Sequence, residues 1–352
     1  MIKVFARGSA LFLLLAALAC PARAELVADL YSGQVPVDSR GRQALERAVG
    51  EALSQVLVKV SGSTDVLTLP GIAEALAGDV LSRAQQFSYV RTGDGGPPLA
   101  ARFDFPQHWV SELLAAAGAP LWTANRPVVL VWLVMDGAGG RQFVNRETAP
   151  ELVTRLEAGF SRRGVPLRFP LFDLADAAAL SPDQAWSLSE TNLRQASTRY
   201  RVEEILAGRL TRLSSGNWLG DWSYLSAKAR SNRSTAPESV DAFLDTGIAL
   251  VAEDMAARYA VATGASTASG VAMSVSNVRS YADYAAVVSW LEGLELIDRA
   301  DVEAIRGDRL QLRLQARADA TQLASIIELN RQLVPAGPQV GSAGELNYQW
   351  QN

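Results

Sequence analysis

The sequence predicts a mixed α+β protein of three modules, in which the middle module is a layered α/β sheet and the last is ferredoxin-like. Three observations support this fold class. Strand-like and helix-like segments alternate along the chain, several segments repeat apolar residues every three or four positions, and one apolar run is typical of a buried strand. A length of 352 residues suits two or three domains. We expect an N-terminal α+β domain at 25–122, a middle domain at 123–262 and a C-terminal domain at 271–352.

The first 24 residues are predicted to be a secretory signal peptide. Lys3 and Arg7 give a positive start, and Ala10–Ala19 is an apolar run too short to span a bilayer. Ala22-Arg23-Ala24 is a small-x-small cleavage site. Cleavage after Ala24 predicts a mature protein in the periplasm, with no membrane span left in it.

A lipoprotein anchored through Cys20 is the alternative. Ala17-Leu18-Ala19-Cys20 resembles a lipobox, in which the cysteine becomes the lipidated first residue. Ala17 stands where that pattern has leucine, and Pro21 directly after the cysteine also fits the pattern poorly. The plain signal peptide is therefore the preferred interpretation.

Composition excludes several classes of function. The full chain has 33 basic and 37 acidic residues, and removal of Lys3, Arg7 and Arg23 leaves 30 basic residues and a net charge near −7. A nucleic-acid-binding protein has a basic excess, so nucleic acid is not an expected partner. Cys20 is the only cysteine, so the cleaved chain forms no disulfide and depends on core packing for its stability.

In the N-terminal block the clearest element is a helix over Arg42–Val60. Leu45, Val49, Leu53 and Leu57 recur every four residues along it, which is the spacing of one buried helix face. The other expected elements are strands over Glu25–Val37, Phe87–Val90 and Leu99–Phe105, and helices over Pro70–Gln85 and from Pro106 to Gly118.

The middle block centres on the apolar run Val128–Met135, which predicts a buried strand. Strands and helices alternate after it, an order that favours a layered sheet. The expected strands are Val165–Phe169, Glu203–Leu213 and Trp218–Arg230, and the expected helices are Ala149–Arg163, Pro182–Tyr200 and Val240–Tyr259.

A segment rich in Gly, Ala, Ser and Thr at 263–270 is predicted to be a linker. Beyond it the order is βαββαβ, which is the ferredoxin-like arrangement. Ser280 can cap the first of its helices with Asp283 as the reciprocal partner. Alternating leucines over 310–314 and the alternation Leu346, Tyr348, Trp350 predict half-buried strands.

The residues that could carry catalysis or bind metal are few. His108 is the only histidine and lies beside Trp109 near a predicted helix start, so a surface role is the preferred interpretation. With one histidine and no cysteine after cleavage, we predict no metal site. The loop Gly137-Ala138-Gly139-Gly140 follows a strand but lacks Gly-x-Gly-x-x-Gly spacing and an immediate helix, so we predict no nucleotide cofactor.

Carboxylates are the remaining acid/base groups. Asp173 and Asp176 lie in a loop after a predicted strand, where ligands of α/β sheets often bind, and are weak catalytic candidates. The structural alternative is helix capping in a solvated loop. Glu203 and Glu204 point to opposite faces if they lie on a strand, so we do not expect them to act as a pair.

Trp218, Trp222 and Tyr224 fall on one face of a predicted strand. If exposed, they form an aromatic platform that could stack on sugar rings or on a partner. If buried, they belong to the core, which is the commoner outcome. They are weak candidates for ligand or partner binding.

A set of sequence phrases between roughly Glu25 and Tyr259 is specific in combination. The phrases cover 42–62, 86–89, 120–122, 126–133, 163–166, 170–176 and 196–200. Together they resemble a proteobacterial exported family described only as domain of unknown function 2066, and Lys59 stands where the family pattern has arginine. The resemblance implies no activity. In fold alone, the middle block is similar to TolB amino-terminal and CsgG-type domains, which bind and assemble rather than catalyse.

We therefore predict a non-catalytic periplasmic adaptor or accessory factor of the cell envelope, with an envelope protein as its partner. The alternatives are a carboxylate-dependent hydrolase acting on glycans through Asp173 and Asp176, and a small-ligand-binding protein with a pocket where the blocks meet.

Overall fold

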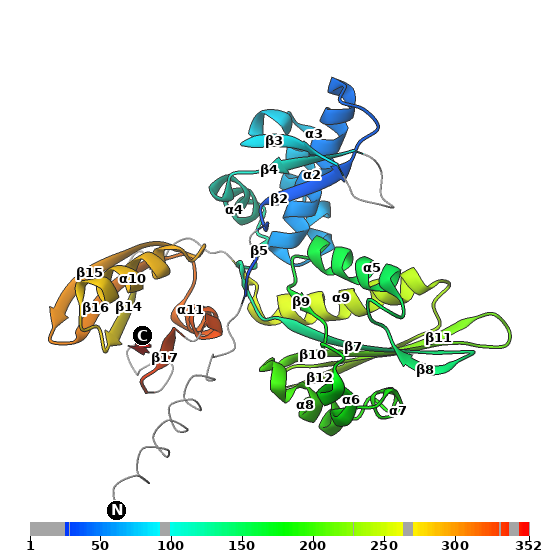
Figure 1. The fold of residues 1–352 in the computed structure, drawn as a ribbon. Coiled ribbons are helices and arrows are strands. Elements are labelled where there is room, and N and C mark those ends of the chain that lie inside the picture. The colour runs from blue at the N-terminus through cyan, green and yellow to red at the C-terminus, as the bar shows by residue number, and fades with distance from the viewer. Residues whose placement is uncertain are drawn as a thin grey trace, which may run out of the picture.

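The computed structural model describes residues 25–27, 29–91, 99–227, 229–262, 270–330, 332–337 and 345–351. Its helices and mixed sheets confirm the α+β fold class (Figure 1). The predicted signal peptide and all but the last residue of the predicted linker lie outside the described residues. The domain boundaries stay predictions.

The first sheet is antiparallel in the order β2 (Ser32–Pro36), β4 (Ala100–Asp104), β3 (Gln86–Val90). The long helix α2 (Arg42–Ser61) packs on one face of it, with all its leucines and all its valines except Val58 buried. Gly33 permits this packing, because a Cβ atom there would lie 2.4 Å from the carbonyl oxygen of Ala52. Helices α3 (Pro70–Ala77) and α4 (Gln107–Ala116) complete this part.

Three expected elements are divided in the structure. The helix predicted over 70–85 ends at Gly78, a poor helix former, and a 3₁₀ turn, η2 (Leu81–Arg83), follows. The strand predicted over 25–37 is split into β1 (Glu25–Leu26) and β2 by a turn. The helix predicted over 182–200 becomes α7 (Pro182–Trp186), α8 (Glu190–Ser197) and η3 (Thr198–Tyr200), because Leu188 adopts a left-handed φ of 52°.

The middle sheet has the order β12 (Arg230–Thr235), β11 (Trp218–Leu225), β10 (Glu204–Arg212), β7 (Val129–Gly137), β8 (Gly140–Phe143), and β9 (Leu167–Arg168) also pairs with β7. β12 forms a separate strand where the sequence predicted one strand over 218–230. β7 is parallel to β10 and is buried on both faces of the sheet.

Alternate residues of β7 feed two different cores. Val129, Val131 and Leu133 pack with α5 (Pro150–Arg162) and α9 (Val240–Tyr259), whereas Leu130 and Trp132 pack on the opposite face. That opposite face is covered by α6 (Leu174–Ala179), α7 and α8 (Figure 1). The result is the three-layered arrangement that alternating strands and helices predict.

The C-terminal sheet has the order β15 (Ile297–Arg306), β16 (Arg309–Ala316), β14 (Val271–Ser276), β18 (Leu346–Trp350), β17 (Leu333–Pro335). Helices α10 (Tyr281–Glu292) and α11 (Ala320–Ile327) connect its strands. The predicted βαββαβ order gains one short strand, β17, at the edge. β18 therefore runs parallel to β14.

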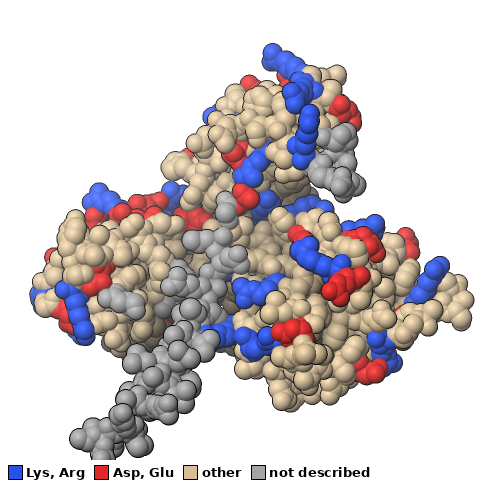
Figure 2. Space-filling model, viewed as in Figure 1, with Lys and Arg blue, Asp and Glu red and all other residues tan. Residues whose placement is uncertain are grey.

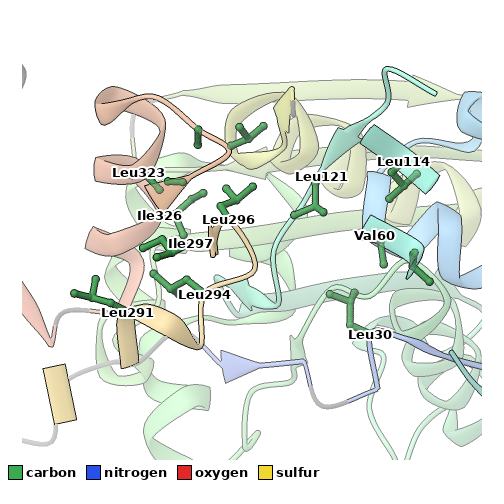
Figure 3. Packing of buried hydrophobic residues seen from close by; sticks show 14 of the residues in the cluster. Leu30, Val60, Leu114, Leu121, Leu291, Leu294, Leu296, Ile297, Leu323 and Ile326 are labelled. Carbon is green, nitrogen blue, oxygen red and sulfur yellow. The ribbon is translucent and has the colours of Figure 1, made fainter. Parts of the chain in front are cut away.

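The cores of the first and last blocks are continuous. One cluster of buried residues includes Val60 and Leu121 from the first block and Leu296 and Ile326 from the last, and Figure 3 shows these groups facing each other. Two short ladders join the first block to the middle block at the same place, since β1 pairs with β6 (Asn125–Arg126) and β13 (Val261–Ala262) pairs with β5 (Pro120–Leu121).

Arg126 lies at the centre of this junction and is fully buried. Its guanidinium donates hydrogen bonds of 2.8 Å to four carbonyl oxygens, one of them on α2 and one just after α5, and lies 3.8 Å from the Trp122 ring centroid. The four carbonyls belong to Lys59, Trp122, Thr123 and Gly164. Burial lowers the pKa of Arg126, an effect that the nearby Glu295 carboxyl opposes.

Gly164 is required for this contact. Its φ is 65°, and a Cβ atom there would lie 2.7 Å from Nη1 of Arg126. The glycine thus brings the end of the α5 segment directly onto the guanidinium, which explains why Gly164 closes the helix predicted over 149–163.

We expect Arg126→Met to lower the free energy of unfolding by about 4 kcal/mol, because four buried carbonyls lose their donor. Urea denaturation followed by circular dichroism measures this. Arg155→Met is the matched control, since Arg155 forms an exposed ion pair with Asp241, and it should cost less than about 1 kcal/mol. Equal effects of the two substitutions would show that Arg126 does not hold the junction together.

Candidate functional site

The two predicted catalytic carboxylates lie together at the start of α6. Asp173 is the N-cap residue and accepts hydrogen bonds from the amides of Ala175 and Asp176, each at 3.0 Å. Its two oxygens also contact Nη1 and Nη2 of Arg199, at 2.6 and 2.9 Å. The Arg199 guanidinium and the two amides hold the pKa of Asp173 at about 2, so this carboxyl is ionised near neutral pH.

Asp176 is 2% exposed and has partners on both oxygens. One oxygen accepts from the amide of Phe172 at 2.8 Å and from the hydroxyl of Tyr200 at 2.5 Å, and the other lies 3.0 Å from Nη1 of Arg199. The Tyr200 hydroxyl in turn accepts from the amide of Leu171 at 2.9 Å. Burial and the bond to Asp176 raise the pKa of Tyr200 to about 12.

These contacts make a closed polar network, which we call the α6 network: Asp173, Asp176, Arg199 and Tyr200. Its geometry suits a scaffold, because each carboxylate is occupied by an arginine and by backbone amides. Sequence reasoning found the two aspartates but not Arg199 and Tyr200, which are more than twenty positions away. The catalytic interpretation of the pair stays a hypothesis.

The side chains that α6 turns outward are apolar. Leu174 is 90% exposed and Leu171, just before the helix, is 70% exposed, while Asp176 is the one buried residue of the helix. The remaining exposed positions of the helix are alanines, at 175, 177, 178 and 179. Figure 2 shows mainly uncharged surface at this end of the middle block. The helix is therefore inverted, with its carboxylate inside and its leucine outside.

Phe172 explains how the loop is oriented. Its φ is 54°, a left-handed value that is uncommon for a bulky residue. Its ring turns inward and packs 5.9 Å from Trp132 and 5.3 Å from Phe143, measured between ring centroids. The backbone turn that buries Phe172 leaves its neighbour Leu171 facing outward.

The aromatic face of β11 belongs to the core, which corrects the exposed-platform interpretation. Trp222 is fully buried, stacks on Phe243 with ring centroids 4.5 Å apart and donates from Nε1 to the Phe243 carbonyl. Tyr224 is also buried. Trp218 lies at the margin of the same core, with the guanidinium of Arg212 5.6 Å from its ring centroid. α9 covers this face, so Trp222 and Tyr224 present no surface to a sugar or partner.

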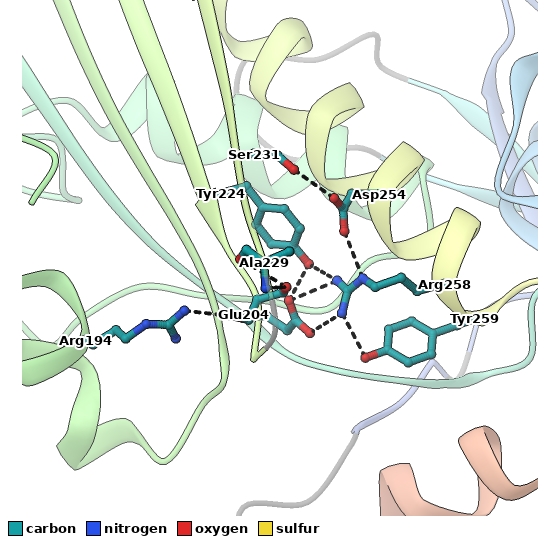
Figure 4. A network of polar contacts seen from close by, with 9 residues as sticks. Arg194, Glu204, Tyr224, Ala229, Ser231, Asp254, Arg258 and Tyr259 are labelled. Atoms are coloured by element: carbon teal, nitrogen blue, oxygen red, sulfur yellow. Dashed lines mark hydrogen bonds and ion pairs between the residues drawn. The ribbon is translucent and has the colours of Figure 1, made fainter. Parts of the chain in front are cut away.

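A second polar network surrounds Glu204, at the start of β10 (Figure 4). Glu204 is buried and forms a two-pronged ion pair with Arg258 of α9, at 3.0 and 3.1 Å, and also accepts from the Tyr224 hydroxyl. Arg258 further contacts Asp254 at 2.8 Å, and Ser231 donates to the other oxygen of Asp254. The network thereby joins β10, β11, β12 and α9.

Burial and the Glu204 charge shift the neighbouring phenols in this network. Desolvation and Glu204 raise the pKa of Tyr259 to about 12 and that of Tyr224 further. Burial is the largest single influence on Arg258 and lowers its pKa, but the bond to Glu204 and the charges of Glu204, Tyr224 and Tyr259 together raise it. Sequence reasoning missed this network, and a glutamate at the head of an apolar strand was the signal that could have found it.

We expect Glu204→Gln to lower the free energy of unfolding by about 3 kcal/mol, because it leaves the Arg258 charge half-buried without its main partner. Chemical denaturation at pH 7 provides the measurement. Glu147→Gln, at an exposed position, is the control and should change stability by less than about 0.5 kcal/mol. A Glu204→Gln protein as stable as the wild type would contradict a structural role for the ion pair.

Lys59 is a buried cation near the junction. Its Nζ donates to the carbonyls of Ser32 at 2.9 Å and Asp29 at 3.3 Å. Burial lowers the pKa of Lys59 from 10.5 to about 8, and the charge of Asp29 opposes that shift. Because the unfolded chain holds this proton to higher pH than the folded chain, the cost of burying the charge disappears as pH rises through 8.

We therefore expect wild type to gain about 2 kcal/mol of stability relative to Lys59→Met between pH 8 and pH 10. Below pH 8 the difference between the two proteins should be constant. Urea denaturation of both proteins at several pH values measures this difference in the free energy of unfolding. The other titrating groups are the same in both proteins, so their contributions cancel. A difference that stays flat or falls above pH 8 would contradict the lowered pKa.

The predicted surface position of His108 agrees with the structure. His108 lies on an exposed turn of α4, with Nδ1 3.1 Å from an oxygen of Glu112. Within the described ranges, histidine, cysteine and carboxylate side chains form no group of three that could hold a metal ion. Of the described helices, none combines the length and apolarity needed to cross a membrane.

Residues 24–123 match a family model described as a domain of unknown function (DUF8605). The chain is thus similar over that range to a family without an assigned activity. No curated protein matches the chain. This family model is not the domain of unknown function 2066 that the sequence resembles, so that resemblance stays a prediction.

Proposed function

We propose that the protein is a non-catalytic binding protein, an adaptor or accessory factor of the cell envelope, and that it docks on a protein partner through Leu171 and Leu174. The observation that carries this proposal is the inverted helix α6, which buries Asp176 and exposes Leu174. Export to the periplasm through residues 1–24, and membership in the exported family that the sequence resembles, belong to the same proposal.

The energetics of α6 support this proposal. Fully burying a leucine side chain contributes about 1.5–3 kcal/mol. Folding of this chain gains almost none of that from Leu174, which is 90% exposed, and the smaller part of it from Leu171, which is 70% exposed. A partner with an apolar groove would gain it on binding. The surrounding polar groups are satisfied internally, so docking need not remove water from an unpaired carboxylate.

Preorganisation supports the same proposal. The α6 network holds the backbone of the loop at two adjacent positions, because Tyr200 and Asp176 accept hydrogen bonds from the amides of Leu171 and Phe172. A rigid anchor loses little conformational entropy when it binds. Two leucines and four alanines are far fewer than the roughly 20–30 residues on each side of a standard interface, so they suit the central anchor of a larger contact.

A hydrolase that uses Asp173 and Asp176 is the second candidate. Its support is the closeness of the two carboxylates at the start of α6. Against it, both are paired with Arg199, and the low pKa of Asp173 leaves no proton on it for a general acid at neutral pH. A small-ligand pocket where the blocks meet has no specific observation in its favour.

We expect the double variant Leu171→Ser, Leu174→Ser to reduce the amount of captured partner protein at least tenfold, because the apolar anchor is gone. In-cell crosslinking followed by mass spectrometry measures that amount. The folded state should be unaffected, since both side chains are exposed. The matched control is Leu213→Ser combined with Leu219→Ser, which alters two other exposed leucines and should leave capture unchanged.

A third variant separates adaptor from enzyme. Asp173→Asn removes a charge from the network but leaves both leucines in place, so the adaptor proposal predicts partner capture near the wild-type level in a folded protein. Glycan hydrolysis by wild type that Asp173→Asn abolishes, with no partner lost from the leucine variant, would instead establish the hydrolase.

A further inference from the structure

Among the strands that the structure describes, β15 is the longest that lies at the edge of a sheet. This ten-residue strand lies at one edge of the C-terminal sheet, away from the other two blocks (Figure 1). The opposite edge strand, β17, has three residues and ends in Pro335, features that discourage strand addition. A side-chain oxygen of Glu292 accepts a hydrogen bond from the amide of Ala300. The part of the strand edge that is free to pair with another strand therefore begins at Asp301.

Two apolar residues are exposed along this open segment. Val302 and Ile305 are 38% and 61% exposed, yet they lie on the helix-covered face of the sheet, opposite the buried Leu312 and Leu310. They share a face although three positions apart, because a β-bulge falls between Val302 and Ala304. The apolar face of the sheet therefore continues to the edge without cover.

The charges on the other face are unbalanced at the same place. Arg306 lies directly opposite Arg309 across the hairpin, and no ion pair within the described residues involves either of them. Like charges in this position are destabilising. Asp301, five residues back on the same face of the same strand, forms side-chain contacts within the described residues only with the exposed Arg299, at 2.5 Å, and Gln315, at 3.4 Å, whereas Glu303 is paired with Arg313.

We propose that two copies of this chain pair through β15, antiparallel and related by a two-fold axis at the bulge. In that register Val302 faces Ile305 of the second copy, and Asp301 faces Arg306 of the second copy. Each contact occurs twice. The pairing covers both exposed apolar residues and gives Arg306 an acid, and it extends the sheet across the dimer. This inference does not depend on the proposed function.

The ladder is short, because the bulge interrupts it and the hairpin turn at Gly307 ends it. An interface of this size falls below that of a stable dimer. We therefore expect a reversible dimer whose population rises with protein concentration, rather than an obligate one.

Sedimentation velocity over a range of protein concentrations tests for this dimer. The protein is expressed from the full sequence and then purified. Wild type should shift from monomer to dimer, and Val302→Lys should weaken association at least tenfold. Val334→Lys is the matched control, because Val334 is 37% exposed on the other edge strand and should leave association unchanged. Circular dichroism checks that each variant is folded.

A charge exchange tests the register. Arg306→Asp alone should weaken association at least tenfold, and Asp301→Arg added to it should restore association. A wild type that stays monomeric at all concentrations overturns the proposal. So does a dimer weakened as much by Val334→Lys as by Val302→Lys, or a double variant no better than Arg306→Asp alone.

Discussion

The buried guanidinium of Arg126 is the contact on which the joining of the first and middle blocks depends. Its partners are backbone carbonyls, which cannot move unless the elements that carry them move too. A planar fork with five N–H donors can reach carbonyls on α2 and after α5 at once, which a lysine ammonium cannot do. The continuous core beside it, from Val60 to Ile326, packs around positions that these hydrogen bonds set.

The two polar networks share one design. In each, an arginine lies between two carboxylates and a tyrosine hydroxyl completes the set: Arg199 in the α6 network and Arg258 around Glu204. Charges are costly to bury unless they are paired and hydrogen-bonded, and both networks meet that condition. The side chains best suited to acid/base chemistry are thereby used to join secondary structure elements.

The sequence was sufficient for elements with a long regular repeat, such as α2, or a continuous apolar run, such as β7. It failed where one residue changes the backbone, as Gly78 and Leu188 do within two predicted helices. The candidate site was predictable only in part for a similar reason. Asp173 and Asp176 are close in the chain, whereas the arginines that bind the carboxylates come from distant elements, and periodicity carries no information about such pairings.

The inverted helix α6 follows from a competition between local pattern and tertiary contacts. Hydrophobicity alone would turn Leu174 inward and Asp176 outward. The Asp176 carboxylate instead has a guanidinium, a hydroxyl and an amide as partners inside, and Phe172 fills the apolar space that a leucine would have taken.

The core beside α6 is thus filled, and its polar groups are paired, without Leu171 and Leu174. Both leucines therefore remain available to a partner. A dimer formed through β15 would carry two such anchors, one on each copy of the chain. Paired anchors raise affinity for a repeated partner without any new contact. The two surfaces, although on different blocks, would therefore reinforce each other.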